Sequence, residues 1–212
     1  MSVRDLFYKA RAKKLQENLR KRNFGCDYFE TKEEARDYIL SQLTSGMTVS
    51  YGGSVSNTES GLLPALKERT DIELLDRMAA TTEEDRMAIE EKAMKADVYL
   101  MGNNGLSMDG ELVNIDGYGN RVAALIYGPK KVFLLTGMNK VGLTLEDAVK
   151  RARNEAAPKN AIRLNKNTPC TQTGKCENCL SEECICSHIV ITRRTRQPQR
   201  IHVVLVGEDL GY

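Results

Sequence analysis

Histidine is scarce in this sequence of 212 residues, with two copies, His188 and His202. Catalysis through Ser-His-Asp or Cys-His arrangements therefore has few candidates. Charge of one sign is scarce as well. The net charge is +2, from 31 Lys and Arg against 29 Asp and Glu, which argues against a dedicated nucleic-acid-binding protein.

Long apolar runs are also missing. No segment approaches the roughly 20 apolar residues that span a bilayer, and the N-terminus lacks the apolar stretch of a secretory signal. We therefore expect a cytoplasmic protein with no membrane segment. The length fits one domain covering residues 1–212, and a hydrophobic content of 41% is typical of a globular chain.

Short apolar segments alternate with helical patterns along most of the chain. Amphipathic spacing predicts a first helix over residues 2–22, and capping-box pairs open two more at Thr31/Glu34 and Thr81/Glu84. The predicted strands are 47–51, 72–75, 97–102, 111–115, 131–136, 188–193 and 201–206, the last two as a closing pair. This order of elements is typical of βα units and predicts an α/β fold with a mainly parallel sheet.

Glycine and polar residues follow the first of these strands. Gly52, Gly53 and Ser54 form a turn whose backbone N–H groups can approach a ligand, and Glu59 lies at the following helix start. The pattern matches neither the P-loop nor the dinucleotide-binding glycine motif. A tight turn with a helix cap is the alternative interpretation.

Two later strands are followed by similar groups. Asn104, Asp116, Asn120 and Arg121 lie in a segment rich in Asn, Asp and Gly, and Asn139 with Lys140 follows strand 131–136. Carboxylate, amide and guanidinium groups can recognise hydroxyls, phosphate or carboxylate. Turn formation or a solvated lysine would also explain them. Their common place after strands predicts one cavity for an anionic small molecule, with Glu59 or Asp116 as candidate catalytic carboxylates.

Five of the six cysteines fall within residues 170–186. The pair Cys176 and Cys179 has the spacing with which two thiolates reach one tetrahedral metal. In a reducing cytosol such crowding indicates a metal site, either zinc or an iron–sulfur cluster, more than disulfides. Free surface thiols are the alternative. The segment 165–187 is therefore expected to be a cysteine-rich loop.

Taken together, these motifs resemble the LUD domain of lactate utilisation proteins (LutC/YkgG-like). The resemblance covers about residues 5–212. It is carried, in order, by Gly52-Gly53-Ser54 with Glu59 and Gly61, Asn114-Ile-Asp116-Gly-Tyr-Gly119-Asn120-Arg121, Tyr127-Gly-Pro129, Gly137-Met-Asn139-Lys140, Ala157-Pro158-Lys-Asn160, Pro169-Cys170, Thr173-Gly174-Lys-Cys176 with Cys179, and a closing Val-Leu-Val-Gly-Glu-Asp-Leu-Gly.

The resemblance implies a fold similar to the NagB/RpiA/CoA-transferase group, with helices on both faces of the sheet. It implies a role in oxidising L-lactate to pyruvate alongside iron–sulfur partner proteins. The family pattern has a basic residue where Cys184 stands, so the resemblance selects Cys170, Cys176, Cys179 and Cys186 as metal ligands, with zinc slightly favoured. In Asn104-Gly-Leu-Ser107 the sequence also departs from the family's Asn-Ala-x-Thr.

Three functions stay open on these grounds. The first is a component of a lactate oxidation system that binds a small anionic or nucleotide-like ligand. The second is a stand-alone isomerase or acyl-CoA-transferase-like enzyme. The third is a non-enzymatic, metal-binding regulatory module. A homodimer is compatible with each.

Overall fold

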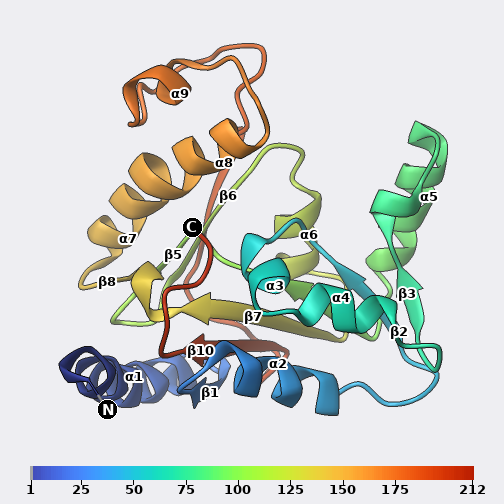
Figure 1. Cartoon of the computed structure of the whole chain (residues 1–212), viewed down its shortest axis with the longest axis horizontal. Coiled ribbons are helices and arrows are strands. Elements are labelled where there is room, and N and C mark those ends of the chain that lie inside the picture. Colours follow the sequence, from blue (N-terminus) through green and yellow to red (C-terminus); the bar gives the residue numbers. More distant parts are fainter. Residues whose placement is uncertain (1) are drawn as a thin grey trace.

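The structure, a computed structural model, describes residues 2–212 and is built around two β-sheets. The larger sheet is entirely parallel (Figure 1). Its strands, in spatial order, are β1 (Gly25–Phe29), β10 (Ile201–Val206), β7 (Lys131–Gly137), β4 (Val98–Met101), β2 (Thr48–Tyr51) and β3 (Glu73–Leu75). The predicted parallel α/β fold is confirmed, including the adjacency of the strands at 47–51, 97–102 and 131–136.

Helices cover both faces of this sheet because alternate strand residues point to opposite sides. In β10, Val203 and Leu205 pack with one hydrophobic cluster, while Val204 and Val206 pack with the other. The first cluster contains residues of α1 (Val3–Lys21), α5 (Glu83–Ala93) and α6 (Asn120–Ile126). The second contains residues of α2 (Lys32–Ser41) and α4 (Leu62–Lys67).

The smaller sheet is mixed and stands beyond the carboxyl ends of the larger one. Its strands, in spatial order, are β8 (Val141–Gly142), β5 (Gly105–Ser107), β6 (Leu112–Asp116) and β9 (His188–Thr192). It packs against α7 (Leu145–Arg151) so closely that a Cβ on Gly105 would lie 2.4 Å from the Ala148 carbonyl oxygen. This contact requires glycine.

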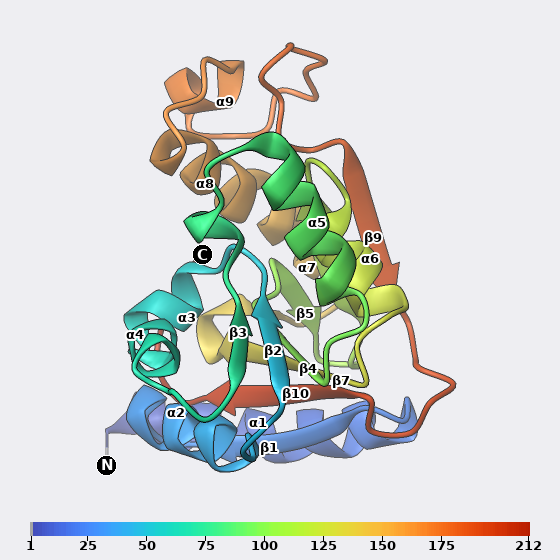
Figure 2. The same ribbon diagram turned by 90° about the vertical axis from the view of Figure 1, so that its right-hand side faces the viewer.

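One long helical segment continues from α7 through the π-helical turn η3 (Ala152–Ala156) into α8 (Ala157–Arg163). Pro158 explains the widened turn, because it has no N–H to donate to the carbonyl four residues earlier and its ring crowds that carbonyl. Beyond α8, residues 165–187 project from the body of the molecule (Figure 2). We call this segment the thiol loop, and it includes the short α9 (Pro169–Thr173).

Several predicted boundaries are wrong for identifiable reasons. Glu59, expected at a helix start, is the last residue of α3 (Val55–Glu59), and α4 follows as a separate helix because Gly61 between them has φ +75°. The predicted pair 188–193 and 201–206 does not exist, since β9 pairs with β6 and β10 with β1 and β7. Strands β1 and β5 were not predicted.

Of the two capping predictions, one is confirmed and the other is wrong. The capping box at Thr31 and Glu34 is confirmed, whereas α5 is capped by Thr82 rather than Thr81.

Three single turns of helix complete the described elements: η1 (Arg77–Ala79), η2 (Met138–Lys140) and, as above, η3. Within residues 2–212, every helix is too short or too polar to cross a membrane.

Candidate functional site

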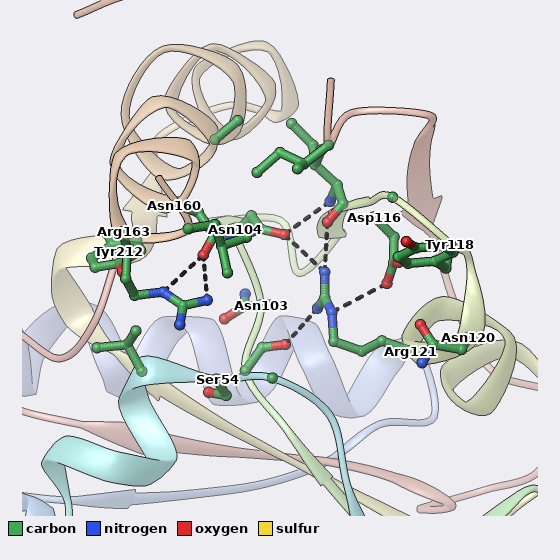
Figure 3. A pocket seen from close by; sticks show the side chains of 18 of the residues that line it. Ser54, Asn103, Asn104, Asp116, Tyr118, Asn120, Arg121, Asn160, Arg163 and Tyr212 are labelled. Atoms are coloured by element: carbon green, nitrogen blue, oxygen red, sulfur yellow. Dashed lines mark hydrogen bonds and ion pairs between the residues drawn. The ribbon is translucent and has the colours of Figure 1, made fainter. Parts of the chain in front are cut away.

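A cavity of about 380 Å³ lies where the carboxyl ends of β2, β4 and β7 face the smaller sheet. Figure 3 shows it with Ser54 and Asn103 on the floor, Arg121 and Asp116 at one side, and Asn160, Arg163 and Tyr212 at the other. Contributions come from segments as distant in sequence as Ser54 and Tyr212. We call it the strand-end cavity.

Positive charge dominates this cavity. Six lining residues are Arg or Lys against one carboxylate, Asp116; the cations are Arg77, Arg86, Arg121, Lys140, Arg163 and Lys166. A concave site lined by one sign of charge concentrates ligands of the opposite sign. The geometry therefore suits an anion.

Arg121 does not present a free fork to that anion. Its guanidinium lies within the wall, where four hydrogen bonds and one ion pair hold it. The partners are the Gly102 carbonyl (3.1 Å), Asn114 Oδ1 (2.8 Å), Asn104 Oδ1 (3.2 Å), the Ile115 carbonyl (2.7 Å) and Asp116 Oδ2 (3.3 Å from Nε). Arg121 thus ties the segment that follows β4 to β6 and shapes that side of the cavity.

Other cations keep donors available. Both bonds from Arg163 go to a single atom, Asn160 Oδ1, from Nε (3.1 Å) and Nη2 (2.8 Å). Arg86 pairs with Glu83 and stacks over the Tyr118 ring at 5.4 Å. Four of the cations were not predicted from the sequence: Arg77, Arg86, Arg163 and Lys166. Only Asn160, in the motif Ala157-Pro158-Lys-Asn160, pointed to α8.

Lys140 lies deeper than the arginines. Its side chain is 2% exposed, and Nζ donates to Ser56 Oγ at 2.8 Å. Burial, followed by the cations Arg151 and Arg121, lowers the pKa of Lys140 to about 7, and Glu59 opposes this weakly. A buried amine of this kind differs chemically from a surface lysine.

The predicted site residues are only partly brought together. Gly53, Ser54, Asn104, Asp116, Asn120, Arg121 and Lys140 line the cavity, whereas Gly52, Glu59 and Asn139 are absent from its lining. Gly52 lies beneath Arg121, where a Cβ would be 2.9 Å from Cγ and Cδ. Its backbone therefore allows the guanidinium to reach the wall.

Glu59 and Asn139 instead hold the segment that precedes Tyr212. Glu59 Oε2 accepts the Gly211 N–H at 2.7 Å, and Asn139 Nδ2 donates to the Gly211 carbonyl at 3.2 Å. Asp116, although it lines the cavity, accepts the Gly119 N–H (3.0 Å) through Oδ1 and faces Arg121 through Oδ2. Asn120 donates to Glu90 at 2.8 Å.

The thiols of the loop border a second, smaller cavity of about 130 Å³; they are Cys170, Cys176, Cys179, Cys184 and Cys186. All are free. Burial raises the pKa of Cys186, and the nearby Cys184, Cys176 and Cys170 add to this rise. Hydrogen bonds from Ser181 lower the pKa of Cys179.

Thiols are suitable ligands for a metal centre, but their arrangement in this structure is not that of a closed metal site. The Asn178 N–H points at Cys176 Sγ (3.4 Å) and the Cys186 N–H at Cys184 Sγ (3.4 Å), and such contacts stabilise thiolates. Across the described residues, however, no three Cys, His, Asp or Glu side chains surround a common point at ligating distance.

The two cavities share a wall formed by Ile115, Ala157 and Ile185. Ile185 belongs to the thiol loop, and its backbone lies 3.6 Å from the Cβ that Gly117 lacks. A change in the loop would therefore reach the strand-end cavity through one layer of side chains.

Comparison with known proteins identifies related sequences and folds. The family model described as the LUD domain matches residues 12–206. The crystal structure of a DUF162 family protein from Deinococcus radiodurans is similar at 11% identity, with a TM-score of 0.56 over 94% of this chain and 98% of that one. No curated protein matches the sequence.

Proposed function

The chain belongs to the LUD domain family, which is associated with lactate utilisation, and on this ground we propose that it is a component of an L-lactate oxidation system. It binds a small anionic or nucleotide-like ligand in the strand-end cavity and works alongside iron–sulfur partner proteins. The observation that carries this proposal is the excess of Arg and Lys around that cavity. We also assign the fold to the NagB/RpiA/CoA-transferase-like group, which the parallel six-stranded sheet supports.

Arg163 offers the sharpest test of ligand binding, because it lines the cavity and its only bonds within the described chain go to Asn160. Calorimetry with lactate, pyruvate, a sugar phosphate and CoA should find at least one ligand. A charge-assisted hydrogen bond is worth about 1.5–3 kcal/mol, so Arg163→Ala should weaken binding at least about tenfold.

The control is Arg36→Ala, which removes a surface arginine paired with Asp37 outside the cavity. It should leave binding unchanged. Failure of every anion to bind the wild-type protein would refute the proposal, and so would equal losses in the two variants.

The competing function is a stand-alone isomerase or acyl-CoA-transferase-like enzyme that uses Glu59 or Asp116. The position of Glu59 disfavours it, since that carboxylate holds Gly211 outside the cavity lining. Asp116 stays a candidate. Turnover of a sugar phosphate or CoA thioester by the isolated chain, abolished in Asp116→Asn, would establish this alternative over ours.

The proposal extends to the thiol loop, in which Cys170, Cys176, Cys179 and Cys186 bind one metal centre. Zinc suits a closed four-thiolate site that holds shape, while an iron–sulfur cluster suits electron transfer; we favour zinc. Their shared cavity and the contact of the Asn178 N–H with Cys176 Sγ support binding. Anaerobic purification followed by metal analysis tests it. The buried Cys26, in β1, provides the control variant Cys26→Ser.

Each outcome of that analysis is informative. One zinc per chain, lost in Cys176→Ser and kept in Cys26→Ser, supports the assignment. A brown protein containing iron and sulfide would replace zinc with a cluster. An anaerobic sample free of metal would refute the site and leave the loop with free thiols, and a metal-bound chain without anion binding would favour a regulatory module.

A further inference from the structure

Lys140 lacks the partner that a buried ammonium group normally has. A charged lysine inside a protein is stable only when it is paired, because desolvation costs several kcal/mol. Yet no carboxylate within residues 2–212 lies at salt-bridge distance from its Nζ, and Ser56 Oγ is the one side-chain partner.

The charged groups around Lys140 make an ammonium less favourable still. Arg151 and Arg121 both act to lower its pKa, and Glu59, which acts in the other direction, is engaged with Gly211. Arg151 is itself fixed by bonds to the carbonyls of Asn139 (2.9 Å) and Asn104 (2.7 Å). A lysine desolvated beside fixed cations is the usual form of a nucleophilic amine.

Lys140 lines a cavity whose other cations attract anions, so its amine and an anion-binding wall border the same space. We propose that Lys140 is a nucleophile that forms an imine with the carbonyl carbon of an anionic carbonyl compound bound in the strand-end cavity. The inference rests on the proposed anion binding and adds the substrate class and the reacting atom. The anionic group of the substrate is a carboxylate, as in a 2-oxo acid, or a phosphate.

The reaction balances without an oxidant or a reductant. The Nζ lone pair forms a bond to the carbonyl carbon while the C–O π bond opens onto oxygen. Two protons then pass from nitrogen to that oxygen, which leaves as water, and a C=N bond remains. Ser56, whose Oγ is 2.8 Å from Nζ, is placed to relay these protons.

Borohydride reduction traps the imine as a stable secondary amine and provides the test. The full-length protein is incubated with pyruvate or dihydroxyacetone phosphate, reduced, and analysed by intact mass and peptide mapping. We expect one adduct per chain, on the peptide containing Lys140. Acetone, a neutral carbonyl compound of similar size, should give none, because it lacks the anionic group.

Lys131 provides a matched control near the other end of β7. It is the first residue of that strand, whereas Lys140 follows the strand in η2, and burial lowers the pKa of both lysines. Lys131→Arg should label like the wild-type protein, whereas Lys140→Arg, which keeps a cation but cannot form the imine, should lose the adduct completely. Circular dichroism of both variants checks that they fold.

The outcomes separate this inference from the proposed function. If calorimetry shows that pyruvate or dihydroxyacetone phosphate binds and no adduct forms, the imine is refuted and anion binding stands. If neither compound binds or labels while another anion binds, the imine is refuted and anion binding stands. If no anion binds, both are refuted. Equal labelling by acetone, or labelling at Lys131, would show non-specific amine chemistry and overturn the assignment. Labelling by one of the two anions identifies the anionic group.

Discussion

The strand-end cavity and the cavity of the thiol loop share the wall formed by Ile115, Ala157 and Ile185. The two regions are nevertheless held in shape by different means. In the cavity wall, the guanidinium of Arg121 joins five acceptors, two from the segment that follows β4 and three from β6. In the loop, Leu180 is fully exposed, and the side chains that face one another are thiols.

The two regions differ in the source of the free energy that orders them. The cavity wall is ordered by folding itself, since its hydrogen bonds form among groups that the sheets bring together. A loop with little apolar surface must obtain that free energy elsewhere, and thiolate–metal bonds can supply it. The two regions should therefore respond oppositely to mutation and to metal.

The largest effect is expected from Arg121→Met. Removing the guanidinium leaves five acceptors without their donor, Asp116 among them, and breaking such a buried network costs about 3–5 kcal/mol. Urea unfolding should show this loss in the free energy of unfolding. Arg163→Ala, which removes two bonds to Asn160 and a contact with Tyr212, should cost less than about 1 kcal/mol. Equal costs would mean that Arg121 has no special place in the wall.

The second effect concerns Lys140 and has a defined sign. Folding lowers its pKa from 10.5 to about 7, so between these two pH values the unfolded chain binds more protons than the folded one. Stability should therefore rise with pH across this window, by up to about 5 kcal/mol from this group. Lys140→Met should abolish that part of the rise. Parallel stability–pH curves for the wild type and the variant would show that Lys140 titrates normally.

Lys140 also shows what the sequence could and could not predict. Short apolar strands alternating with helices were enough for the parallel sheet, and the position of Lys140 after strand 131–136 placed it at the cavity. Its hydrogen-bond partner, Ser56, belongs to another helix, and no local sequence pattern predicts a contact across 84 positions. The chemical state of the lysine depends on such contacts.

The errors have the same origin. β1 was missed because Gly25–Phe29 is short, and the residues at Asn23 and Gly25 looked like a helix end. The strands at 188–193 and 201–206 were paired because they are neighbours in sequence, whereas each joins a different sheet. Arg163 and Arg86 line the cavity from helices whose sequences resemble any solvated helix. Tertiary arrangement, rather than propensity, decides these points.

The third prediction concerns the loop alone. Zinc at 100 times its dissociation constant should stabilise the metal-binding conformation by about 2.7 kcal/mol. Hydrogen exchange should then slow in residues 165–187 and stay unchanged in β7 and β10. Cys179→Ser should remove the protection, and Cys26→Ser should not. Slower exchange throughout the sheet would contradict the separation between the two regions.

The smallest effect is expected at Glu59, which the sequence suggested as a catalytic carboxylate. Glu59 is exposed and accepts one N–H, that of Gly211, so Glu59→Ala should cost at most about 1 kcal/mol. Glu59→Gln keeps an acceptor oxygen and removes the charge. Because Glu59 raises the pKa of Lys140, this variant should lower that pKa and move imine trapping to lower pH, with anion binding and lactate-dependent growth retained. If a stable Glu59→Gln variant lost growth on lactate, Glu59 would be a catalytic residue after all. The reacting group would then lie outside the cavity lining.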